Sequence, residues 1–226
     1  MKKQMSETFL IGAVLAAVGG YLDAYTYTCR GHVFANAQTG NIVLLGVKAA
    51  ERDWAGVFYY AIPILAFVIG IFIAEQIRKR FTAQSNLHWR QIVVLIEAAV
   101  LFGIGFLPTG GLDMLANVLV AFVCSLQAES FRKVNGSPYA TTMCTGNLRS
   151  AAEQMFLYSQ TKERRFLQSS ARYCGIIAFF ILGACVGALL TGPWGGRAVF
   201  AAGAALLLVF LLMFFKDETE SREGKA

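Results

Sequence analysis

Charged residues and proline are scarce in this sequence. Of its 226 residues, 15% are charged and only 4 are proline, whereas 56% are hydrophobic and 22 are glycine. A soluble domain of this size carries charge on about a quarter of its residues, so the composition excludes an ordinary soluble protein. The sequence therefore predicts a membrane protein.

Paired cysteines and clustered histidines are also missing. The five cysteines are odd in number and far apart, without a Cys-x-x-Cys pair: Cys29, Cys124, Cys144, Cys174 and Cys185. The two histidines, His32 and His88, have no metal-ligand spacing. This pattern excludes a disulfide framework and contains no zinc motif, so we expect no metal and no cofactor.

Catalytic signatures are absent as well. The sequence holds no Gly-x-Ser-x-Gly, no His-Glu-x-x-His and no phosphate-binding loop. Each of these motifs places a nucleophile, a metal or a phosphate at a fixed spacing that catalysis requires. We therefore expect that the protein is not an enzyme.

Long apolar runs are what the sequence has in place of these features. A helix needs about 20 residues to cross the hydrocarbon core of a bilayer. Six runs approach that length, the third being the shortest: 9–28, 58–77, 92–107, 112–131, 167–190 and 198–215. We predict an all-α, polytopic membrane protein with six transmembrane helices, the first of them retained and not cleaved as a signal peptide.

The formal net charge of +6 reflects membrane orientation. Basic residues gather at 2–3, 78–80, 132–133 and 162–165, which fall on one side of the membrane if all six spans cross. Cytoplasmic loops carry such an excess of lysine and arginine. We therefore predict cytoplasmic termini, a disordered cytoplasmic tail at 217–226, and no nucleic-acid partner.

A polar triplet, Thr-Gly-Asn, occurs twice, as Thr39, Gly40 and Asn41 and again as Thr145, Gly146 and Asn147. A shift of 104 residues also places "LDAYTY" (22–27) on "LQAESF" (126–131), and "AFVIG" (66–70) resembles "AFFILG" (178–183). These similarities predict a duplication, with repeats at 1–108 and 109–216. Because each copy has three spans, the two copies would be inverted in the membrane.

The segments at 32–50 and 137–159 contain the triplets and are too short or too polar for full spans. We predict that both are re-entrant: each enters the membrane as irregular backbone and returns as a half-helix, whose start the threonine or asparagine caps. The two starts would meet at a central site. In the alternative, Thr39 and Thr145 cap amphipathic helices that lie on the two membrane surfaces.

Two helix N-termini that meet near mid-membrane offer free amide groups and positive dipole ends to an anion or a polar solute. We therefore predict a channel or carrier for a small polar solute or anion, with its pathway at the repeat interface. The candidate substrate-binding residues are Asp23, Asn36, Gln38, Thr39, Gly40, Asn41, Glu97, Thr145, Gly146 and Asn147.

Asp23 and Glu97 belong to this set because they lie inside predicted spans. An ionisable residue at the centre of a span costs ~2.5–3.5 kcal/mol on insertion scales, so it is a functional candidate by default. Either carboxyl group could carry a proton during transport. The structural alternatives for Asp23 are bonds to the backbone of the re-entrant segment and an ion pair with Arg30.

Small residues recur at helix-contact spacing, among them Gly183 and Gly187 in the fifth span and Gly70 in the second. They allow two helix backbones to approach closely. We expect them to pack within the chain, although a homodimer stays open.

The stretches "GGYLDAYTY" (19–27), "GHVFANAQTGNIVLLG" (31–46) and "TGNLRSA" (145–151) resemble the YoaK-like family of small bacterial membrane proteins, which carry a domain of unknown function. The resemblance covers about 10–215. It implies a six-span protein of the bacterial inner (plasma) membrane, with the lipid bilayer as its surroundings, and it implies no substrate. A non-transporting membrane scaffold or sensor is therefore the alternative to a transport protein.

Overall fold

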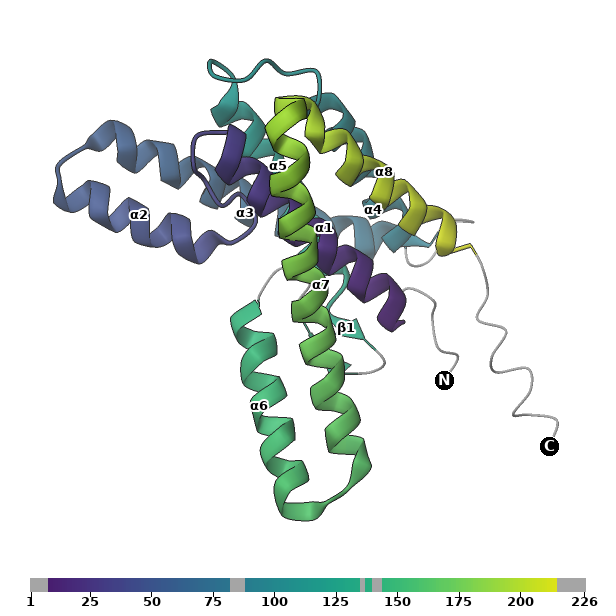
Figure 1. Ribbon diagram of the computed structural model, residues 1–226. Coiled ribbons are helices and arrows are strands. Elements are labelled where there is room, and N and C mark those ends of the chain that lie inside the picture. The colour runs from purple at the N-terminus through teal and green to yellow at the C-terminus, as the bar shows by residue number, and fades with distance from the viewer. Residues whose placement is uncertain (1–7, 82–87, 135–136, 140–143, 215–226) are drawn as a thin grey trace.

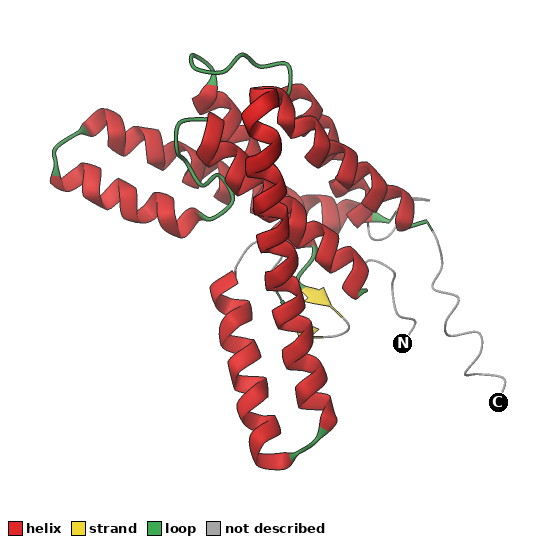
Figure 2. Ribbon diagram, viewed as in Figure 1, coloured by secondary structure: helices red, strands yellow, loops and turns green. Residues whose placement is uncertain are grey.

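The computed structural model describes residues 8–81, 88–134, 137–139 and 144–214. Helices make up most of the described chain, and two short antiparallel strands, β1 (Lys133–Val134) and β2 (Ser137–Pro138), join two of them (Figure 2). The predicted all-α class is confirmed. The predicted tail at 217–226 lies outside the described residues.

Each of the six predicted spans overlaps a helix over most of its described length. They are α1 (Phe9–Cys29), α2 (Gln38–Ala50), α3 (Trp54–Phe81), α4 (Trp89–Ile104), α5 (Asp113–Ser130), α6 (Cys144–Thr161), α7 (Arg164–Trp194) and α8 (Val199–Leu212), with the 3₁₀ turn η2 (Gly195–Ala198) before α8. By length and composition, α1, α3 and the continuous stretch Arg164–Leu212 could each cross a membrane. That last stretch contains the fifth predicted span and most of the sixth.

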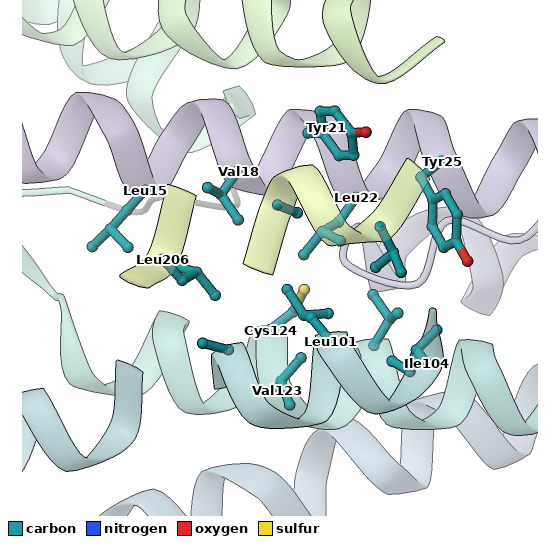
Figure 3. Close-up of a cluster of buried hydrophobic side chains, with 14 of the residues drawn as sticks. Leu15, Val18, Tyr21, Leu22, Tyr25, Leu101, Ile104, Val123, Cys124 and Leu206 are labelled. Carbon is teal, nitrogen blue, oxygen red and sulfur yellow. The ribbon is translucent and has the colours of Figure 1, made fainter. Parts of the chain in front are cut away.

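The helix α1 is apolar on all sides and lies at the centre of the molecule (Figure 1). A helix of this kind is stable only inside a protein core or a membrane, because no face of it prefers water. Its side chains meet those of α4, α5 and α8 in the largest cluster of buried residues (Figure 3). Leu15 and Leu22 of α1, Leu101 of α4, Val123 of α5 and Leu206 of α8 belong to this cluster.

The helices of the two halves pack in matching pairs. α1 packs against α7, and α5 packs against α3; α2 packs against α3, and α6 packs against α7. α4 packs against α8, α1 also contacts α8, and α5 also contacts α4. When α1 to α4 are exchanged with α5 to α8, each of these contacts corresponds to another of them or to itself. The smaller contact between α3 and α4 has no counterpart of like size between α7 and α8.

Glycines allow the closest of these contacts. A Cβ atom on Gly183 of α7 would overlap the carbonyl oxygen of Ala17 on α1, and one on Gly70 of α3 would lie 2.7 Å from the carbonyl oxygen of Phe122 on α5. Gly187 similarly faces Tyr21 on α1. The expectation that these small residues pack within the chain is confirmed.

Two helical hairpins project from the core, and we call them the α2–α3 arm and the α6–α7 arm (Figure 1). Each arm turns back through a basic residue with left-handed backbone, Arg52 (φ 57°) in the first and Lys162 (φ 58°) in the second. These turns lie at the outer ends of the arms, whereas α2 and α6 begin near the core (Figure 1).

A buried arginine joins the end of α1 to both halves of the chain. Arg30 is 0% exposed, and its guanidinium group donates to the Tyr25 hydroxyl, to Asp113 on α5 and to three carbonyl groups at the end of α4 and just after it, those of Ile104, Leu107 and Pro108. The Tyr25 hydroxyl donates in turn to the carbonyl of Gly196 in η2. The alternative that Arg30 pairs with Asp23 is therefore wrong.

We predict that Gly183→Ala lowers the free energy of unfolding by about 1–3 kcal/mol, because the new methyl group collides with backbone atoms of α1 that have no room to move. Thermal unfolding of the detergent-solubilised protein measures the effect. Gly192→Ala on the same helix is the matched control, since no atom lies within 4 Å of the added carbon. Equal destabilisation by the two variants would contradict the close contact.

Candidate functional site

The segment between α1 and α2 is irregular, and α1 supplies its hydrogen bonds. The Oδ1 atom of Asp23 accepts from the backbone N–H of Asn36 at 3.0 Å and of Ala37 at 3.2 Å. The Thr26 hydroxyl accepts from the backbone N–H of Ala35 at 3.3 Å, and the Asn36 side chain donates to the carbonyl of Gly19. Asp23 therefore binds the backbone of this segment, as one of the two structural alternatives expected.

Side chains in the first turn of α2 also donate hydrogen bonds to the backbone of this segment. The side-chain amide of Asn41 donates to the carbonyl of Phe34 at 2.9 Å and to the side-chain oxygen of Gln38 at 3.1 Å. Gln38 donates to the carbonyl of Ala35 at 2.8 Å. Four of the candidate residues, Asp23, Asn36, Gln38 and Asn41, thus lie together around one loop.

The threonine of the first triplet does not cap its helix. The N-cap position of α2 is Ala37, which makes no side-chain capping bond, and Thr39 lies one residue inside the helix with its side chain exposed. The capping role that we assigned to Thr39 from the sequence is wrong, because the helix begins one residue before the triplet and not at it.

The second triplet has the same position in its own helix. The described part of α6 begins at Cys144, one residue before Thr145, and α2 begins at Gln38, one residue before Thr39. Thr145 and Gly146 are exposed, whereas Asn147 is buried. In both helices, therefore, the asparagine faces the protein and the threonine faces outward.

Asp23 also lies near the start of α6. Burial raises the pKa of the Cys144 thiol above its ordinary value, and the negative charge of Asp23 raises it further. The carboxyl group that binds the first segment therefore acts electrostatically on Cys144, the first described residue of α6. Residues 140–143, which precede α6, lie outside the described residues.

Glu97 is a second buried carboxyl group in the same core. It is 1% exposed on α4, and its Oε1 atom accepts no hydrogen bond from the described residues. Both Glu97 and Asp23 lie within electrostatic range of Cys124 on α5. The two acidic candidates therefore share a neighbour, although no group of three potential ligands that could hold a metal forms among the described residues.

Asn117 was missed by the sequence analysis, and Arg30 was considered there only as a partner for Asp23. The Asn117 side chain is 0% exposed and donates to the carbonyl of Arg30 at 2.7 Å. Its position as a polar residue inside the apolar run of α5 could have identified Asn117 as a buried hydrogen-bonding residue. The position of Arg30 just past the end of α1 gave none, since an arginine there usually faces water.

We predict that Asp23→Leu destabilises the protein by about 1–3 kcal/mol for each backbone N–H that loses its partner, those of Asn36 and Ala37. Asp23→Asn keeps a carbonyl oxygen for both bonds, so it should change stability far less. Chemical unfolding of the two variants measures the difference. Equal losses in both would mean that charge, and not hydrogen bonding, holds the segment.

Comparison with known proteins agrees with the predicted resemblance. The family described as "Protein of unknown function (DUF1275)" matches residues 11–213. The UPF0700 transmembrane protein YoaK of Bacillus subtilis (strain 168) is 25% identical over 185 residues, which cover 78% of this chain and 81% of that protein. No solved structure matches. These matches and the apolar helices indicate a multi-pass transmembrane protein, and the chain belongs to the DUF1275 family.

Proposed function

We propose that the protein is a membrane transport protein, a channel or a carrier, for a small polar solute or anion. The observation that supports this proposal best is the common orientation of the two triplets: in α2 and in α6 the asparagine of Thr-Gly-Asn is buried and the threonine is exposed. Polar side chains that recur in this way, next to irregular backbone, are the usual construction of a solute site between transporter repeats.

The two halves are, in this proposal, inverted repeats at 1–108 and 109–216. The exchange of helix contacts between the halves supports it. So do the glycine contacts: a shift of 104 residues carries Val18 onto Phe122, and Gly183 packs on Ala17 while Gly70 packs on Phe122. Corresponding glycines therefore touch corresponding turns of α1 and α5, to within one residue.

Six helices cross the inner membrane in this proposal, namely α1, α3, α4, α5, α7 and α8, with both termini cytoplasmic. α2 has 13 residues, or about 20 Å at 1.5 Å per residue, which is too short to cross about 30 Å of hydrocarbon. The charged arm turns, with Lys48, Glu51 and Asp53 in one and Glu163 and Arg165 in the other, require water. Because the two repeats are inverted in this proposal, the two turns would lie in water on opposite sides of the membrane.

One feature favours the alternative, a scaffold or sensor that recruits a partner. On α6, Leu148 and Phe156 are 61% and 63% exposed, and the ion pair between Arg149 and Glu153 (2.8 Å) lies on the same helix. A helix with exposed apolar and paired charged residues suits a protein partner as well as a membrane boundary. A flux measurement separates the two functions.

We predict that the two arm turns lie on opposite sides of the membrane. An epitope tag inserted after Arg52 should be accessible from outside the cell, and a tag inserted after Lys162 should be accessible only after permeabilisation. Proteolysis of sealed, oriented vesicles checks both positions. Recovery of both tags on the same face would exclude the inverted arrangement.

We also predict that Asn41→Leu and Asn147→Leu each lower solute flux by roughly tenfold or more, because each removes a buried amide from the pathway, and a lost interaction of about 1.4 kcal/mol corresponds to a factor of ten. Flux into liposomes that hold the purified protein is measured against a panel of small solutes and ions. Val43→Leu, at an exposed position next to the first triplet, is the control and should leave flux unchanged. Wild-type flux in folded forms of both asparagine variants would disprove the site.

A further inference from the structure

The start of α2 already holds an anion, and that anion belongs to the protein. Helix N-termini attract negative charge because their first N–H groups are free and the helix dipole places roughly half a positive charge there. At α2 the Asp23 carboxylate accepts from the N–H groups of Asn36 and Ala37, just before the helix. A full negative charge outweighs the dipole, so this helix start has little attraction left for an anionic solute.

The polar atoms that remain without partners at this place are acceptors. The side-chain oxygens of Asn36 and Asn41 are buried and accept no hydrogen bond from the described residues. Their orientation is fixed, because each NH₂ group donates to a carbonyl, that of Gly19 or that of Phe34, and a carbonyl cannot donate in return. A buried acceptor without a donor costs free energy. A ligand that brings positive charge or donors would remove that cost.

The charge balance of the core points the same way. The buried charged residues of the described part of the chain are Asp23, Arg30 and Glu97. Arg30 uses its five N–H donors on Tyr25, Asp113 and three carbonyls, so it offers nothing to an anion. Two carboxyl groups are then left, and neither has a basic side chain as hydrogen-bond partner among the described residues.

This inference rests on the transport function proposed above but replaces the anion considered there. We propose that the solute is a small monovalent cation, an alkali-metal ion or a protonated primary amine, held by the side-chain oxygens of Asn36 and Asn41 beside the Asp23 carboxylate. Glu97 is a second buried carboxyl group in the same core, and a bound cation would favour its charged form. The two kinds of cation share one chemistry, since each replaces its hydration shell with carbonyl and carboxylate oxygens.

Neutral oxygens suit transport as well as binding. A site must attract the ion strongly enough to strip water from it and weakly enough to release it. Two amide oxygens with one carboxylate, itself already sharing its charge with two N–H groups, meet both conditions better than a ring of carboxylates would. The chemistry therefore favours a monovalent ion over a divalent one.

The test uses the full chain in liposomes, with uptake of rubidium and of methylammonium measured beside efflux of chloride and uptake of urea. Cation uptake above that of empty liposomes, with little chloride or urea flux, is expected, and the two cations show which source of positive charge the site prefers. Asp23→Asn keeps the loop bonds and Glu97→Gln keeps the shape. Each should lower cation uptake by roughly tenfold or more, because a unit charge near an ion in a low-dielectric interior outweighs a factor of ten in binding.

Glu153→Gln, which removes a carboxylate from the exposed surface of α6, is the matched control and should leave uptake unchanged. Chloride or urea flux without cation flux would overturn the cation proposal and leave the transport function standing. Absence of flux for all four solutes would overturn both. Cation uptake that Asp23→Asn and Glu97→Gln leave at wild-type level, with unfolding curves like that of the unaltered protein, would also disprove the cation site.

Discussion

The need to bond every backbone group away from water governs the centre of this protein. The chain leaves α1, makes an irregular segment and begins α2 beside buried helices, where each unpaired N–H or C=O would be costly. Asp23 and Thr26 on α1, with Gln38 and Asn41 on α2, supply those bonds. The position of the α2–α3 arm, and of the candidate site, follows from this small set of side chains.

Neither half of the chain has a core of its own. The largest buried cluster takes side chains from α1 and α4 in the first half and from α5 and α8 in the second. α1 packs on α7, and α5 packs on α3, so the first helix of each half packs against a helix of the other half. The two halves therefore form one interlocked unit.

Much of this arrangement could be predicted from the sequence, because hydrophobic run length, glycine spacing and a repeated triplet are local signals. The close glycine contacts and the position of each triplet within a short helix belong to that part. The direction of each side chain could not be predicted, because it depends on where the helix begins and on how it packs. The helix α2 begins one residue before the triplet, with Thr39 exposed and Asn41 buried. The bonds of Arg30 could not be predicted either, because its acceptors are carbonyls far away in the chain.

The burial of α1 has a consequence for synthesis of the protein. Tyr21 of α1 donates to the carbonyl of Ala198, 177 positions later in the chain. At a translation rate of about 5–20 residues per second, the ribosome reaches that partner roughly ten to forty seconds after α1 has been made. During that interval the surface of α1 that later packs against α7 and α8 contacts the insertion machinery or lipid instead, so the bundle can close only after the second half of the chain has been made.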